Sequence, residues 1–182
     1  EQIRAILPNF QRQEFLDRAY DIFVKVQEAW MNFDLESVRN LLSDDMYSMY
    51  TSQLDTLKIK NQKNIMKDFA LDYMNIQSIK EENGKVSIEV LLDVVFKDYI
   101  INTMTNEVVR GLEHAGFKTT YVLTFVVSKN FDPNREVTCP NCHAKTKVNQ
   151  AGKCEYCDSI LVNNQYDYVL TKKQFIKKER KY

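Results

Sequence analysis

The stretch that decides the fold is residues 83–96, which reads Asn-Gly-Lys-Val-Ser-Ile-Glu-Val-Leu-Leu-Asp-Val-Val-Phe. From Val86 to Phe96 every second side chain is apolar, and the residues between them include Ser87 and Asp93. This period of two predicts a long strand with one wholly apolar face. The Asn-Gly pair at its start is typical of a two-residue hairpin turn, so it predicts an antiparallel strand before it.

Three further segments around this strand have the composition of strands. Residues 67–80 precede the turn and alternate in character, residues 119–129 are rich in β-branched and aromatic side chains, and residues 166–176 follow later. Residues 102–116 are mostly polar and contain two of the four glycines, which predicts a connecting loop.

The first sixty residues have the spacing of helices. Residues 1–8 are expected to be an extended lead-in, followed by a helix over 11–32. A short helix is predicted to start at Asp34 as its cap, and a third to start at Ser43. The apolar faces of the two longer helices are formed by Phe15, Ala19, Ile22, Phe23, Val26 and Trp30, and by Met46, Met49, Tyr50, Gln53, Leu54 and Leu57. Helices followed by antiparallel strands predict an α+β fold.

The composition restricts the class of protein. Of the 182 residues, 44% are hydrophobic and 27% are charged, which is typical of a soluble globular domain. The 25 basic and 25 acidic residues balance. This argues against general nucleic-acid binding, where a basic excess provides most of the affinity. No apolar run approaches the roughly 20 residues that a membrane-spanning helix needs.

All four cysteines lie in two Cys-x-x-Cys pairs, Cys139 with Cys142 and Cys154 with Cys157. Two residues between cysteines let both sulfurs of a turn face one point, and two such turns supply four thiolates in a tetrahedron. The doubled pair therefore predicts a zinc ion bound by all four. A four-thiolate site leaves no open position, so the ion is expected to hold structure and not to activate water.

A redox role or disulfide bonding fits the four cysteines less well than a metal does. A thioredoxin-like redox pair would open a helix in a βαβ unit, and no such unit is predicted. Two disulfides would give no reason for the doubled spacing. His143 is expected in the second shell or in solvent. Lysines of the loop could offset the charge of about minus two of such a site; they are Lys145, Lys147 and Lys153.

The cysteine module, residues 136–159, lies between two predicted strands. We therefore expect it to extend their hairpin and to leave the core of the main domain, residues 1–135 and 160–182, intact.

Several motifs follow one another in a characteristic order. They are Phe10, Phe15 and Phe23 in a Phe-x4-Phe-x7-Phe pattern, Val26-Gln27-Glu28-Ala29-Trp30, Asp34-Leu35-Glu36, Leu41-Leu42-Ser43-Asp44-Asp45-Met46-Tyr47, Gln53-Leu54, Asn61-Gln62-Lys63-Asn64 and, after the cysteines, Tyr166-Asp167-Tyr168-Val169-Leu170. In this order they resemble the Tim44-like domain family, which includes the C-terminal domain of the membrane-tethering subunit of the mitochondrial inner-membrane import motor. The chain is most similar to bacterial members with an inserted zinc ribbon. One departure is Asp158, where the family often has Gly after the last cysteine.

The resemblance implies a fold like nuclear transport factor two, in which a strongly curved antiparallel sheet wraps helices into a cone with an apolar pocket. It also implies a non-enzymatic binding or adaptor role, a link to protein transport, and a membrane lipid or membrane-associated protein as partner. Attachment to the membrane, on the cytoplasmic face, is expected through sequence outside this chain. Six aromatic residues are candidates for lining the pocket: Trp30, Phe33, Tyr47, Tyr50, Phe96 and Phe125.

The basic residues near the C-terminus form a second group of candidates. They are Lys172, Lys173, Lys177, Lys178, Arg180 and Lys181, with Phe175 and Ile176 among them. Each such charge near an anionic membrane contributes about 1 kcal/mol of attraction, so these residues are candidates for a membrane surface. The alternative is a strand end with a solvated tail.

Two alternative functions remain open from the sequence. An acid–base enzyme of the same fold would bring His114 and an aspartate, such as Asp72 or Asp93, together in a closed pocket. The preferred interpretation of all three residues is solvent exposure, His114 in a polar loop and the two aspartates on the polar faces of strands. A ribosome- or RNA-binding module would use a basic, aromatic ribbon surface, yet Tyr156 is the lone aromatic residue there.

Overall fold

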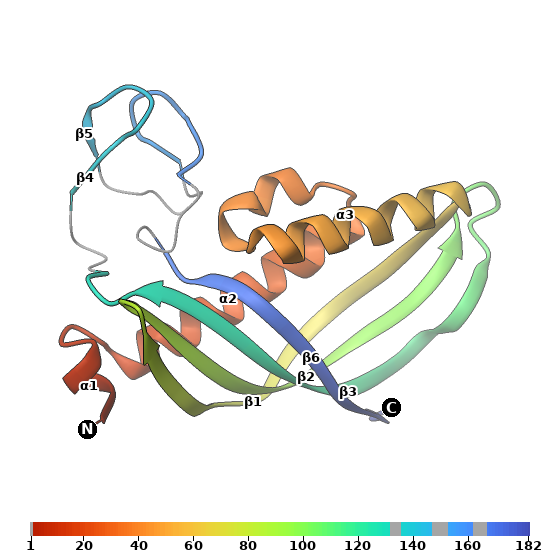
Figure 1. Cartoon of the computed structure of the whole chain (residues 1–182). Coiled ribbons are helices and arrows are strands. Elements are labelled where there is room, and N and C mark those ends of the chain that lie inside the picture. The colour runs from red at the N-terminus through yellow and green to blue at the C-terminus, as the bar shows by residue number, and fades with distance from the viewer. Residues whose placement is uncertain (1, 132–135, 147–152, 162–166) are drawn as a thin grey trace.

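The computed structural model describes residues 2–131, 136–146, 153–161 and 167–182. Three α-helices and one 3-10 helix come first: α1 (Gln2–Ile6), α2 (Arg12–Met31), η1 (Leu35–Leu41) and α3 (Asp44–Ile59). Four long strands follow, β1 (Gln62–Glu82), β2 (Lys85–Asn102), β3 (Val108–Ser128) and β6 (Val169–Arg180), interrupted by the short β4 (Val137–Thr138) and β5 (Lys145–Thr146). This order confirms the predicted α+β class (Figure 1).

The four long strands form one antiparallel sheet in the order β1-β2-β3-β6. Glu82 pairs with Lys85 across the first turn, where Asn83 and Gly84 have φ values of 51° and 74°. Positive φ at both central positions is the geometry that Asn-Gly favours in a tight hairpin. The sequence prediction of this hairpin is therefore confirmed.

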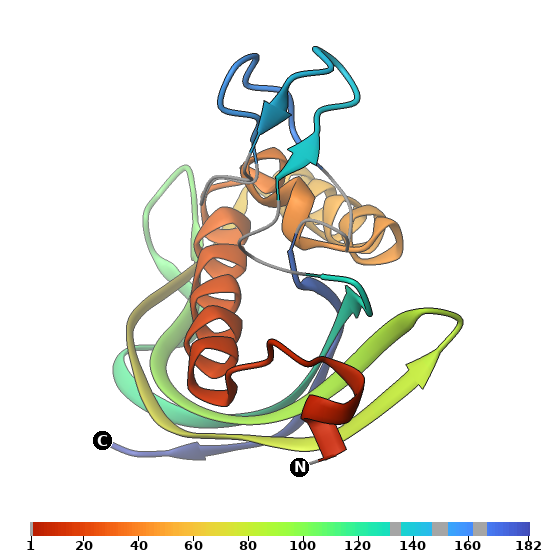
Figure 2. The same cartoon turned by 90° about the vertical axis from the view of Figure 1, so that its left-hand side faces the viewer.

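The core lies between α2 and one face of the sheet. The alternate residues of β2 from Val86 to Phe96 are at most 1% exposed. Phe15, Phe23 and Val26 of α2 are buried to the same degree. Figure 2 shows the strands bending around α2, which lies along the inner side of the sheet. Each large apolar side chain buried in this way contributes roughly 1.5–3 kcal/mol to folding.

Helix α3 is tied to the edge strand β6 at its start. The Ser43 hydroxyl accepts a hydrogen bond from the backbone N–H of Met46, at 3.3 Å, so Ser43 is the helix cap as predicted. The N–H of Ser43 donates to the carbonyl oxygen of Leu170 at 3.1 Å. Met46, Tyr50 and Leu54 are buried, whereas Met49, predicted on the same face, is 47% exposed.

Several boundaries differ from the prediction. The loop predicted over residues 102–116 is confined to 103–107, because β2 continues to Asn102 and β3 begins at Val108. Within the predicted lead-in, residues 2–6 form α1. The side chain of Asp34 makes no capping hydrogen bond; its backbone carbonyl accepts one from the Ser37 hydroxyl. Strand β6 starts later than expected and runs to Arg180; Tyr166 lies outside the described residues.

Candidate metal centre

Two turns of the same construction carry the four cysteines. In the first, Cys139 N–H donates to Ala144 O at 3.0 Å, and His143 N–H donates to Cys139 O at 2.9 Å. In the second, Cys154 takes the place of Cys139, and its N–H donates to Ser159 O at 2.9 Å. His143 and Asp158 occupy equivalent positions with φ of 59° and 55°. Glycine is the usual residue in this left-handed region, and Asp is among the few others that tolerate it, so Asp158 fits the turn.

The four sulfur atoms form a compact group. All lie within 4.8 Å of one another, and the Sγ atoms of Cys139 and Cys157 and of Cys142 and Cys154 are each 3.7 Å apart. A disulfide requires about 2.05 Å between sulfurs. A tetrahedron with Zn–S bonds of about 2.3 Å has edges of about 3.8 Å. The donor set and its spacing therefore fit a tetrahedral metal ion and do not fit disulfides.

Polar groups around the sulfurs favour thiolates. The Ser159 hydroxyl lies 3.0 Å from the Sγ of Cys157 and 3.2 Å from that of Cys139. Its hydrogen bonding lowers the pKa of both thiols, that of Cys157 to about 6. Asn141 Nδ2 donates to Cys157 Sγ at 3.6 Å. Such outer contacts orient metal ligands and stabilise their charge.

Cys142 shows why these sulfurs need a cation. The Ala144 N–H lowers the pKa of this thiol, but burial and the neighbouring sulfurs outweigh it and raise the pKa to about 12. A divalent ion at the centre reverses this penalty, because it attracts all four thiolates. His143 is exposed and outside the sulfur group, and Lys145 and Lys153 are also exposed. Lys147 lies outside the described residues.

The module has a small core of its own. Cys139, Cys154 and Leu161 are at most 2% exposed and pack with Val137 and Cys157, apart from the main core. β4 pairs with β5, and a single bridge joins Lys153 to Ile160. Since β3 and β6 are antiparallel neighbours, the module is inserted in the connection between them (Figure 1).

A comparison with protein-family models adds a finding about the rest of the chain. The model of the Tim44-like domain matches residues 1–135. The chain belongs to the Tim44-like domain family. No curated protein matches the sequence. The cysteine turns follow the matched residues, so they are an addition to the part of the Tim44-like domain that the family model covers.

The basic candidates of this Tim44-like domain separate into two groups on β6 and the residues after it. Lys172, Lys177, Lys178, Arg180 and Lys181 are exposed, and of these Lys177 is paired with Glu179 at 3.2 Å and Lys178 with Asp98 at 2.9 Å. Lys173 instead has its ammonium group 3.1 Å from Gln27 Oε1 on α2. Phe175 and Ile176 are 58% and 46% exposed between them. No helix in the described part of the chain has the length and apolar character to cross a membrane.

The six aromatic candidates of the Tim44-like domain have different surroundings. Phe96 and Phe125 are at most 1% exposed and packed in the core. Arg39 lies over the ring of Tyr47, and Lys58 over that of Phe33. Trp30 and Tyr50 do meet, with ring centroids 5.1 Å apart.

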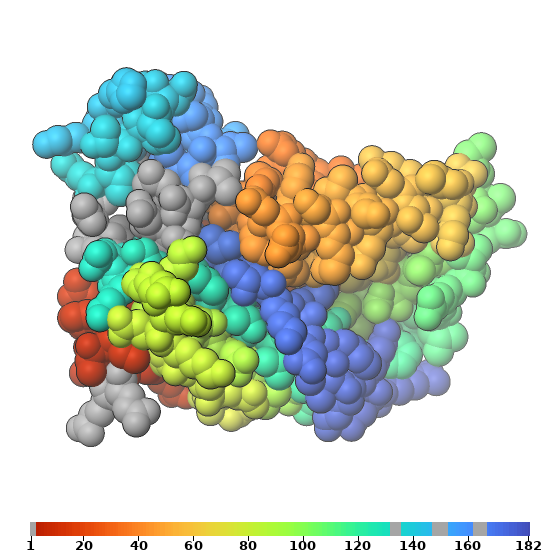
Figure 3. Space-filling view, in the orientation of Figure 1, coloured from red at the N-terminus to blue at the C-terminus, as the bar shows by residue number. Residues whose placement is uncertain are grey.

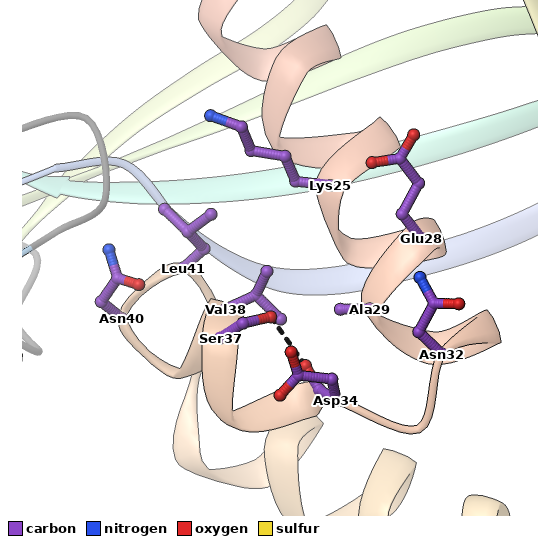
Figure 4. A pocket seen from close by; sticks show the side chains of 9 residues that line it. All are labelled: Lys25, Glu28, Ala29, Asn32, Asp34, Ser37, Val38, Asn40 and Leu41. Atoms are coloured by element: carbon purple, nitrogen blue, oxygen red, sulfur yellow. Dashed lines mark hydrogen bonds between the residues drawn. The ribbon is translucent and has the colours of Figure 1, made fainter.

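A cavity of about 450 Å³ that the sequence did not indicate lies between α2 and η1 (Figure 4). Its lining contains both positively and negatively charged side chains, with Lys25 and Glu28 on one side and Asp34 on the other. Lys25 is already paired with Asp21 at 2.9 Å. No residue pattern could have revealed it, because its walls come from the flank of one helix and a separate 3-10 turn.

The acid–base arrangement considered from the sequence is contradicted at His114. This residue lies on β3, and its side chain is 92% exposed. Asp72 and Asp93 both lie near Lys118, at 2.7 and 3.6 Å. The three residues therefore do not converge in a closed pocket.

Proposed function

We propose that this Tim44-like domain is a non-catalytic binding or adaptor module that works at the surface of a membrane, in a process linked to protein transport. Its partner is a membrane lipid or a membrane-associated protein. We also propose that the cysteine module holds a structural zinc ion and that the fold is the cone of nuclear transport factor two. Membership of the family supports the role, and the sheet that bends around α2 supports the cone.

The observation that carries the membrane proposal is the exposed side of the C-terminal strand. Lys172 and Lys177 are exposed on β6 and Lys181 just after it, and the apolar side chain of Ile176 is exposed on the same edge strand. The exposed ring of Phe175 lies on the inner face of this strand, beside Tyr121. Cationic and apolar groups side by side match a membrane interface, where lysines meet anionic headgroups and apolar side chains enter the headgroup boundary.

Co-sedimentation with vesicles tests this role. The protein should bind anionic vesicles and release them as salt is raised. Replacing Lys172, Lys177 and Lys181 together by Gln should weaken binding by up to about a hundredfold, at about 1 kcal/mol per charge. A matched variant that replaces the exposed Lys60, Lys80 and Lys85 by Gln should lose much less. Equal losses in the two variants, or equal binding to neutral vesicles, would refute the proposed surface.

A further inference from the structure

Lys173 of β6 faces the interior, as does Lys178, but Lys178 is paired with Asp98 at 2.9 Å. Lys173 pairs in register with Leu123, which is fully buried, and side chains of paired residues share a face of the sheet. Its Nζ lies 3.1 Å from Gln27 Oε1, 5.3 Å from the ring centroid of Tyr121 and 5.5 Å from that of Tyr50. Four elements thus meet at this point: Tyr121 comes from β3, Lys173 from β6, Gln27 from α2 and Tyr50 from α3.

This ammonium group has no anionic partner among the residues that the structure describes. No carboxylate within the described ranges forms an ion pair with Lys173. The negative charge of Asp98 affects Lys173 only at long range. The carboxylate oxygens of Asp98 instead accept hydrogen bonds from Lys178 Nζ at 2.9 Å and Asn64 Nδ2 at 2.8 Å. Burial lowers the pKa of Lys173 to about 8. A cation that is removed from water without a counter-ion is costly, so a bound anion would be stabilised here.

A second polar group beside Lys173 is also without a partner. Tyr50 is 5% exposed, and its hydroxyl has no hydrogen-bond partner in the described part of the protein. Burial raises the pKa of this phenol, so the group keeps its proton and is a hydrogen-bond donor. A buried donor without an acceptor is rare in native proteins, so an acceptor supplied from outside the chain would be stabilised here.

The site is open to solvent on one side. Lys173 is only half-buried. Figure 3 shows the surface hollowed between α3 and β6, the two elements that carry Tyr50 and Lys173. Trp30 packs against Tyr50, and the exposed Phe175 lies 6.3 Å from Tyr121 between ring centroids, so apolar rings flank the polar group.

We propose that Lys173, Tyr50 and Gln27 form a binding site for the carboxylate of an amphipathic monocarboxylic acid, whose apolar chain leaves the site past Trp30 and Phe175. One lysine balances one negative charge, whereas a phosphate dianion would need a second cation close by. The carboxylate accepts hydrogen bonds from the ammonium group and from the Tyr50 hydroxyl, while Gln27 holds the ammonium group in place.

Isothermal titration of the full chain with decanoate, below the concentration at which it aggregates, tests the site in the absence of any membrane. Decanol and acetate are the matched probes, because one lacks the charge and the other lacks the chain. We expect saturable binding of decanoate at one site, at least tenfold tighter than that of either probe. Decanoate binding no tighter than decanol binding would overturn the proposal.

Variants locate the binding. Lys173→Met should weaken decanoate binding at least tenfold and leave decanol binding unchanged, whereas Lys172→Met, which changes an exposed neighbour, should bind as the parent does. Tyr50→Phe removes a single oxygen atom and should weaken binding severalfold with an unchanged circular dichroism spectrum. Parental affinity in both Lys173→Met and Tyr50→Phe would refute the site. The titration contains no vesicles, so a negative result would leave the membrane proposal unaffected. In the same way, a negative result in the vesicle experiment would leave the carboxylate site unaffected.

Discussion

Lys173 shows how one side chain couples burial to the pH dependence of stability. Its pKa falls from 10.5 to about 8 in the folded protein because burial disfavours the charged form. Between these two pH values the unfolded chain binds a proton that the folded chain has lost, so the free energy of unfolding rises with pH across that window. Below about pH 8 the full penalty is present, about 3 kcal/mol for a shift of this size.

We therefore expect Lys173→Met to be more stable than the parent at pH 7, by up to about 3 kcal/mol, and the difference to shrink towards pH 10. Urea unfolding of both proteins at pH 7, 8.5 and 10 measures this difference. Lys172→Met, on the same strand but exposed, is the control and should follow the parent. A constant difference across pH, or a less stable Lys173→Met, would contradict this account of the lysine.

The residues of the metal centre were only partly predictable. Four cysteines with doubled spacing indicate a metal whatever the surrounding fold, because the spacing is local. Ser159 has no such signature, since its contact with Cys139 depends on how the two turns meet. The sequence also could not predict that the side chain of Lys173 faces the inner side of the sheet. Register shifts between Thr120 and Tyr121 and between Thr124 and Phe125 decide which lysines of β6 face inward.

At the scale of the elements, the start of α3 depends on one hydroxyl. Ser43→Ala should lower the free energy of unfolding by about 1 kcal/mol, because the N–H of Met46 loses its acceptor. Ser48→Ala, at an exposed position inside the same helix, should change stability by no more than about 0.5 kcal/mol. Thermal or urea unfolding compares the two variants. Equal effects would mean that the cap contributes nothing to this helix.

The elements that the sequence predicted best have an unbroken period. Helix α2 keeps one buried face, and strand β2 does so from Val86 to Phe96, so their patterns can be recognised. Residues 108–116 were misassigned because glycines usually mark loops. Gly111 instead lies within β3 at a register shift, with φ of 85° and the backbone of Tyr99 close by. A bulge of this kind requires glycine without ending the strand.

At the scale of the whole molecule, the two cores predict two levels of stability. The small core around Cys139, Cys154 and Leu161 is expected to depend on the proposed metal, whereas the main core between α2 and the sheet contains none of the four cysteines. Removing the metal should therefore unfold the cysteine module and leave the main domain folded.

Elemental analysis should find one zinc ion per chain. Its removal by a chelator should abolish hydrogen-exchange protection of the Cys139 and Cys154 N–H groups, which donate to Ala144 O and Ser159 O, while that of β2 persists. Cys154→Ser should behave as the chelated protein does. Free, fully titratable thiols in the purified protein would contradict the metal site. Loss of protection in β2 together with the module would contradict the division into two cores.

The insertion of the module between β3 and β6 has a consequence for the order of folding. Strand β6 joins the sheet only after the long segment that follows β3 at Ser128 has been closed into a loop, and closure is less probable the longer the segment is. A metal that ties Cys139 to Cys157 shortens the segment to be closed. A zinc ion bound there as proposed would therefore speed the arrival of the last strand, and the sheet would be completed more slowly in a chain that lacks the metal.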